Sequence, residues 1–264
     1  MPKVHVNGID LHYELKGNPE GSTVVFVNGL LTDTNSWAQH LPYFEDEYRL
    51  LLFDSRGQGQ SEKPEGPYSV NQHAEDLAAL LKELDITAAN FVGLSNGGTE
   101  LLPLTLNNPE LVNSIVLSDA YAYVDTILEA KIDAWLEAAR VSPELRFLVA
   151  TPYVWGNTFL EENQELFDHF KQAAHEAPQK ATEYLIEGAK LFELPGPLQE
   201  ISSPALIVVG DEDILTPPEY SRHIASRLPN GELTILEDAG HASAIERAEE
   251  FCHRVLDFFE EVIQ

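Results

Sequence analysis

Short apolar runs alternate with amphipathic stretches along most of the chain. The apolar runs cover residues 23–27, 49–53, 91–93, 114–117, 205–209 and 233–236. Between them leucines recur at helical spacing, as in the segment after Ser69, which we expect to cap a helix. Short apolar strands that alternate with helices indicate a parallel sheet covered on both faces. Residues 4–13 instead alternate about Asn7-Gly8, which predicts an antiparallel hairpin at one edge and completes an eight-stranded sheet.

The alternation is interrupted between residues 121 and 200. This stretch holds amphipathic segments at 127–140, 161–176 and 180–192, together with two of the three tryptophans, Trp135 and Trp155. An insertion of this length within an α/β alternation is more readily a helical cap than an unstructured loop. We therefore expect one α/β domain over residues 1–264, with a core at 1–120 and 201–264 and a helical cap at 121–200, inserted after the sixth strand. A closing helix is expected over residues 244–262.

The charge of the chain limits its partners. Forty-four acidic residues against sixteen basic ones give a net charge of −28. A field of that sign repels nucleic acid and anionic lipid, so we expect no nucleic-acid partner and no membrane partner. Adaptation to high salt would explain the charge, because salt screens self-repulsion over short distances. An ordinary acidic protein is the alternative, and both stay open.

The chain carries no pattern typical of export. Its first five residues lack the charged and then apolar order of a signal peptide, and no apolar run approaches the ~20 residues of a membrane span. Cys252 is the only cysteine, which leaves no pair for a disulfide and favours a reducing compartment. We therefore expect a cytoplasmic protein, with assembly as a homodimer left open.

The most informative motif is GLSNGG at residues 93–98, which follows an apolar run and leads into a helical pattern. This is the sequence form of a nucleophile elbow, a sharp strand-to-helix turn that exposes a serine hydroxyl. Glycines give the turn the room and the backbone freedom that it needs. We expect Ser95 to be a nucleophile.

A nucleophilic serine needs a base, and the base needs an acid to orient it. After an elbow these follow in the order acid and then histidine. His241 lies in DAGH, directly after the last expected strand, and is our candidate base. Three carboxylates compete in GDED at residues 210–213; we choose Asp213 and assign Asp211 to the turn. Asp119, after the preceding strand, is a lesser contender.

Two backbone N–H groups should stabilise the oxyanion that forms during such a reaction. One belongs to Asn96, which follows the nucleophile. The other is expected in the loop after residues 23–27, where Gly29 frees the backbone of Leu30. The sequence shows neither metal-ligand spacing nor a phosphate-binding glycine loop, so we expect no metal and no cofactor.

Further motifs resemble the α/β-hydrolase superfamily over nearly the whole chain. DSRGQGQS at residues 54–61 matches the family's D-x-R-G-x-G-x-S loop, and Trp37 lies nine residues after Asn28, where members often carry an aromatic residue. Most relatives have histidine where Asn28 stands. The elbow with its D-x-R-G loop looks like the branch of 3-oxoadipate enol-lactonases and small carboxylesterases. The Asn-Gly pair with Gly-Gln-Ser downstream is also similar to the acyltransferases of rhamnolipid assembly.

The resemblance implies a Ser–His–Asp triad, and a serine nucleophile points to acyl chemistry on a small molecule. We expect a serine hydrolase that cleaves a carboxylic ester or lactone through an acyl-enzyme. An acyltransferase with the same triad and a non-catalytic small-molecule receptor are the alternatives, since one fold hosts many functions. The expected substrate pocket is lined by Asn28, Trp37, Tyr121, Trp135 and Trp155, although aromatic residues of the cap could equally form its own packing.

Overall fold

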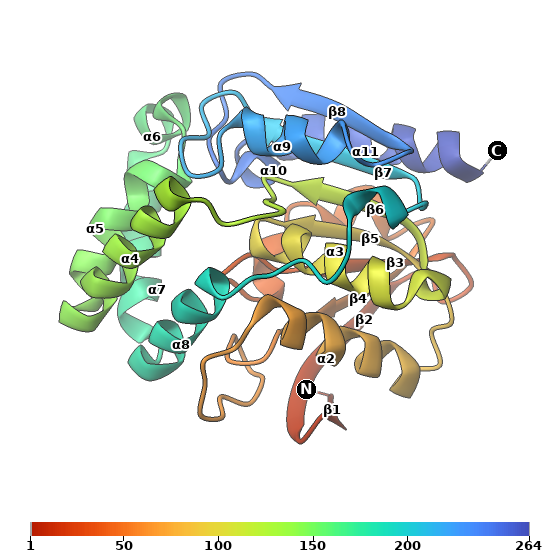
Figure 1. The fold of residues 1–264 in the computed structure, drawn as a ribbon, viewed down its shortest axis with the longest axis horizontal. Helices are drawn as coiled ribbons and strands as arrows, with labels where there is room; N and C mark the ends of the chain where they lie inside the picture. The colour runs from red at the N-terminus through yellow and green to blue at the C-terminus, as the bar shows by residue number, and fades with distance from the viewer. Residues whose placement is uncertain (1, 264) are drawn as a thin grey trace.

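A computed structural model describes residues 2–263, and one eight-stranded sheet lies at its centre. The strands are β1 (Lys3–Val6), β2 (Ile9–Gly17), β3 (Thr23–Val27), β4 (Arg49–Phe53), β5 (Ala89–Leu94), β6 (Val112–Ser118), β7 (Ala205–Gly210) and β8 (Gly231–Leu236). Their order is β1-β2-β4-β3-β5-β6-β7-β8 (Figure 1). The pairs β1–β2 and β2–β4 are antiparallel, and the other neighbours are parallel. The predicted α/β architecture with its edge hairpin is confirmed.

Each face of the sheet has its own apolar core, because successive strand residues point to opposite sides. In β3, Val25 packs into one core and Phe26 into the other. The first face is covered by helices α2 (Val70–Glu83), α3 (Asn96–Asn107) and α9 (Pro218–Ala225). The second is covered by α1 (Leu41–Phe44), α10 (Ser243–Glu246) and α11 (Ala248–Ile263).

Five helices between β6 and β7 form the cap that the sequence predicts after the sixth strand. They are α4 (Thr126–Val141), α5 (Pro143–Val154), α6 (Asn157–Glu162), α7 (Gln164–Glu176) and α8 (Gln179–Lys190). They gather at one end of the sheet (Figure 1). Asp125 caps α4 by accepting the N–H of Leu128 at 2.8 Å. Within the described residues, no helix has the length and apolar character that crossing a membrane requires.

Four segments differ from the sequence-based expectation. Helix α5 was not predicted, because Pro152 lies inside it and obscures the helical pattern. The helix expected at 161–176 is two helices that meet at Asn163. The closing helix is also two, since Arg247 leaves the helical conformation and bonds Glu237 and Asp238 with its guanidinium. The segment near residues 37–44 holds a 3-10 turn (Thr34–Trp37) before the short α1; two more such turns are Pro109–Leu111 and Leu198–Glu200.

Candidate active site

Ser95 lies at the turn between β5 and α3 with a φ of 53°, a left-handed conformation that non-glycine residues rarely adopt. Its own N–H donates to the carbonyl of Ser118 at 2.7 Å, which fixes the turn to the end of β6. A Cβ on Gly93 would lie 2.6 Å from the backbone nitrogen of Gly98, and one on Gly97 would lie 2.3 Å from the carbonyl oxygen of Val27. The strained turn therefore depends on glycine at both positions.

His241 and Asp213 form a continuous chain of hydrogen bonds with Ser95. The Nδ1 of His241 lies 2.9 Å from Oδ2 of Asp213, and its Nε2 lies 2.6 Å from the hydroxyl oxygen of Ser95. A carboxylate accepts only, so Nδ1 carries the proton and Nε2 is left to accept from the serine hydroxyl. The three residues come from the ends of β5, β7 and β8, which the parallel sheet brings to one edge. The structure thus brings together the three residues that the sequence analysis singled out.

Asp213 is buried and oriented by its own loop. Its Oδ1 accepts the backbone N–H groups of Leu215 and Thr216 at 2.8 and 2.9 Å, and the Thr216 hydroxyl lies 2.9 Å from Oδ2. Thr216 belongs to no motif, and only its position three residues after Asp213 indicates that it orients this carboxylate. Asp211 does not bond its own turn, as its Oδ1 accepts the Ala239 N–H at 3.4 Å.

The charge around His241 favours its protonated form. Burial acts to lower the pKa of His241, but the charge of Asp213, their hydrogen bond and the more distant Asp119 and Glu246 outweigh burial. The pKa of the imidazole is therefore raised above its ordinary value. Such an arrangement makes the histidine a stronger base toward the Ser95 hydroxyl.

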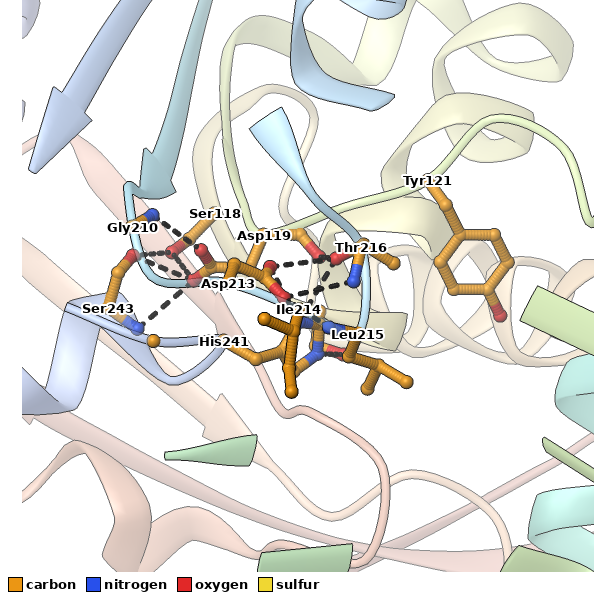
Figure 2. Close-up of polar contacts among 12 residues, drawn as sticks. Ser118, Asp119, Tyr121, Gly210, Asp213, Ile214, Leu215, Thr216, His241 and Ser243 are labelled. Atoms are coloured by element: carbon orange, nitrogen blue, oxygen red, sulfur yellow. Dashed lines mark hydrogen bonds and ion pairs between the residues drawn. The ribbon is translucent and has the colours of Figure 1, made fainter. Parts of the chain in front are cut away.

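Asp119, the lesser contender for the acid, has no hydrogen bond to His241 in the described structure, and its carboxylate contacts Ser118, Gly210 and Ser243 instead (Figure 2). Its Oδ1 accepts the N–H of Gly210 at 3.2 Å. Its Oδ2 accepts the hydroxyls of Ser118 and Ser243, each at 2.7 Å, and the Ser243 N–H at 3.2 Å. Asp119 therefore ties the start of the acid loop to the segment just after His241. Burial and the neighbouring Asp213 charge raise the pKa of this carboxyl.

The two expected oxyanion donors lie beside the serine. The backbone N–H groups of Leu30 and Asn96 form no hydrogen bond with any described residue, and both residues line the same cavity as Ser95. The next N–H, that of Leu31, is occupied, because it donates to Oε1 of Gln58 at 2.5 Å. Gln58 stands in the D-x-R-G-x-G-x-S loop, but the motif alone does not reveal this contact.

Asn28 and Trp37 do not line the cavity beside Ser95, so the sequence-based prediction that they do is wrong. Both are almost fully buried in the core. The indole Nε1 of Trp37 donates to Oδ1 of Asn28 at 2.9 Å, and Nδ2 of Asn28 donates to the Phe53 carbonyl at 2.8 Å. The polar atoms of both side chains thus have partners within the core, which keeps Asn28 and Trp37 out of the cavity.

The cavity above Ser95 has a volume of about 110 Å³. Tyr121, Trp135 and Trp155 line it, as expected from the sequence. The hydroxyl of Tyr121 donates to Oδ1 of Asn96 at 3.2 Å and so holds the side chain beside the nucleophile. The other apolar lining residues are Leu30, Leu94, Leu128, Ile132, Val154, Ile186, Ala189, Leu215, Ala242 and Ile245.

The cap is joined to the core next to His241. Oε2 of Glu246 accepts the backbone N–H groups of Gly240 at 3.0 Å and Gly156 at 3.2 Å. The N–H of Ala242 donates to the Val154 carbonyl at 3.0 Å. A Cβ on Gly240 would lie 2.2 Å from the Gly156 nitrogen, so both backbones approach closely only because these residues are glycines. Burial raises the pKa of Glu246.

A serine, a histidine and an aspartate thus form one hydrogen-bonded chain beside an apolar cavity. The sequence pattern of the alpha/beta hydrolase fold family matches residues 22–248. The chain belongs to the alpha/beta hydrolase family. Within the described residues, no group of three or more histidine, cysteine, aspartate or glutamate side chains is placed to hold a metal ion.

Three relatives illustrate the range of the family. The chain is 27% identical to 3-oxoadipate enol-lactonase 2 of Acinetobacter baylyi over 94% of this chain and 92% of that protein. It is 29% identical to RutD of Stutzerimonas stutzeri, named as a candidate carbamate hydrolase, over 95% of this chain and 97% of that protein. The fold also matches the crystal structure of MGS-M2, an alpha/beta hydrolase enzyme from a Medee basin deep-sea metagenome library. The two superpose with a TM-score of 0.92 at 28% identity, over 98% of this chain and 97% of that chain.

Proposed function

We propose that this member of the alpha/beta hydrolase family is a serine hydrolase that cleaves a carboxylic ester or lactone. The observation that carries the proposal is the 2.6 Å contact between the Ser95 hydroxyl and Nε2 of His241, whose Nδ1 is held by Asp213. This contact lies beside the unoccupied backbone N–H groups of Leu30 and Asn96. A nucleophile, a base, an orienting acid and oxyanion donors are the parts that acyl transfer requires.

Acylation begins when Ser95 Oγ attacks the acyl carbon and its proton passes to Nε2 of His241. The carbonyl oxygen becomes an oxyanion, which accepts hydrogen bonds from the N–H groups of Leu30 and Asn96. The tetrahedral intermediate then collapses, and His241 gives the proton to the leaving alkoxide. Asp213 stays ionised throughout and holds the imidazole in the required tautomer.

Deacylation repeats these steps with water as the nucleophile. His241 takes a proton from the water, the hydroxide attacks the acyl carbon, and Ser95 Oγ leaves and is reprotonated. An ester yields a free alcohol and a carboxylic acid. A lactone yields a single hydroxy acid, because its alcohol remains part of the acyl chain.

Hydrolysis of p-nitrophenyl esters from acetate to decanoate, and of a γ-lactone, tests the proposal in low and in molar KCl. We expect turnover by the wild type and a loss of at least about 1,000-fold in Ser95→Ala. Ser226→Ala is the matched control, since Ser226 lies on the exposed end of α9 and donates only to the His223 carbonyl. Equal rates in Ser95→Ala and the wild type, or no turnover of any ester or lactone, would overturn the proposal.

A further inference from the structure

The cavity over Ser95 lacks charged side chains. Among the described residues that line it, none is lysine, arginine, aspartate or glutamate. Its roof is apolar, with Leu128 and Ile132 from α4 and Ile186 from α8. The basic residues of the cap have other partners: Arg146 donates to the Ala174 carbonyl, Arg140 pairs with Glu137, and Lys131 donates to the carbonyls of Ile214 and Leu215.

Carboxylates stand directly behind the cavity wall. Glu246 accepts hydrogen bonds from Gly240 and Gly156, the neighbours of the lining residues His241 and Trp155. Glu212 lies on the same side, where its Oε2 accepts the Thr158 N–H at 3.4 Å. Asp213 lies on the other side of the His241 ring from Ser95. A free carboxylate inside the cavity would be repelled by these groups, and no lysine or arginine among the described lining residues could pair with it.

We infer that the cavity selects uncharged acyl groups and rejects those that carry a free carboxylate. This inference rests on the proposed ester or lactone hydrolysis and names the substrate class within it: an uncharged ester or lactone with an apolar acyl part. A carboxylate that loses its water without a partner is strongly disfavoured. An apolar chain of the same length gains from the same walls.

Dimethyl adipate and monomethyl adipate form a matched pair of substrates, because they differ only in one ionised carboxyl at neutral pH. We expect kcat/KM for the diester to exceed that for the monoester by about 100-fold or more. In a pH-stat, the diester should then release one equivalent of acid and accumulate as the monoester. A ratio below about threefold would overturn the inference and leave the proposed function standing.

Binding tests the inference without turnover. In Ser95→Ala, the fluorescence of Trp135 and Trp155 reports occupancy of the cavity that both residues line. We expect dimethyl adipate to bind at least 10-fold more tightly than monomethyl adipate. If the wild type turns over no ester or lactone but this preference is found, the proposed function fails and the inference holds. Equal binding of the two would overturn the inference.

Ile132→Lys supplies the missing cation in the roof, and Ile132→Met is its control of similar size. We expect the lysine variant to raise kcat/KM for the monoester at least 10-fold relative to the diester, and the methionine variant to leave the ratio unchanged. An unchanged ratio in a folded Ile132→Lys protein would count against the inference. If that variant does not fold, the wild-type ratio and the Ser95→Ala binding measurement decide the question by themselves.

Discussion

The backbone N–H of Leu31 donates to the side-chain Oε1 of Gln58 at 2.5 Å and thereby joins two loops that are far apart in the sequence. Leu31 has a φ of 63°, so this contact holds the backbone in a conformation that leucine rarely adopts. Asp54 makes a second link between the loops by accepting the Thr34 N–H at 2.9 Å. The two contacts hold the loop that follows Leu30, the residue whose backbone N–H we propose as an oxyanion donor.

Gln58→Met should therefore weaken the oxyanion site while keeping the bulk of the side chain. We expect kcat to fall about 10- to 100-fold with little change in KM, because the lost interaction forms fully only in the transition state. Affinity for a trifluoromethyl ketone, whose serine adduct carries an oxyanion, should fall in parallel. Gln60→Met is the control, since that side chain lies beside His12. A rise in KM alone, or a loss of stability with kcat unchanged, would contradict a positioning role.

Asp119→Asn should leave the acidic limb of the pH profile in place. The base must be neutral to accept the serine proton, so kcat/KM falls as the pH decreases through the pKa of His241. Burial and the charge of Asp213 raise the pKa of Asp119 to about 8, so this carboxyl is largely protonated over that limb and asparagine removes little charge. Asp211→Asn is the control with the same change of side chain. A limb that moves by about one pH unit in Asp119→Asn alone would contradict the prediction.

Glu246→Gln should make stability less dependent on pH. Burial raises the pKa of Glu246 from 4.5, so folding favours its protonated form. The stability that protonated Glu246 adds to the folded state is fully present below pH 4.5. It is lost as the pH rises through the higher pKa that this carboxyl has in the folded protein. The glutamine oxygen still accepts from Gly240 and Gly156, so we expect a Tm at pH 7 at or above that of the wild type. Glu246→Ala leaves both N–H groups without a partner and should cost about 1–3 kcal/mol. A Tm for Glu246→Gln as low as that for Glu246→Ala would contradict this.

Salt should stabilise the protein. Forty-four acidic residues outnumber sixteen basic ones, and the resulting net charge of −28 on 264 residues imposes self-repulsion on the folded protein. The Debye length falls from about 10 Å at 0.1 M to about 3 Å at 1 M salt, which screens this repulsion. We expect Tm to rise between low and molar KCl in calorimetry. No rise over that range would remove the explanation of the charge as an adaptation to high salt.

The sheet and the nucleophile turn could be predicted because their signals are local. The apolar runs have the length and composition of buried parallel strands, and the glycines around Ser95 are required by the close approach of neighbouring backbones. Parallel strands then bring the residues after β5, β7 and β8 to one edge, so the sequence alone indicates His241 and Asp213.

Contacts between distant segments could not be predicted in the same way. The Asn28–Trp37 pair turns inward because each side chain satisfies the other, and a spacing of nine residues does not show in which direction they point. The bond from Gln58 to Leu31 and the bridge from Glu246 to Gly156 join residues 27 and 90 positions apart. Helix α5 was missed for a local reason, its internal Pro152.

The core and the cap supply different parts of the site, so the cap can change in evolution while the core stays the same. The groups that we propose to react lie on loops of the core, whereas most of the roof comes from helices in one uninterrupted stretch, residues 126–190. A combinatorial library confined to the codons of that stretch, with Gly156 kept, would vary the shape of the cavity and leave Ser95, Asp213 and His241 in place. Recombination that exchanges this stretch between homologous genes would do the same in nature, so substrate range can change in one genetic event.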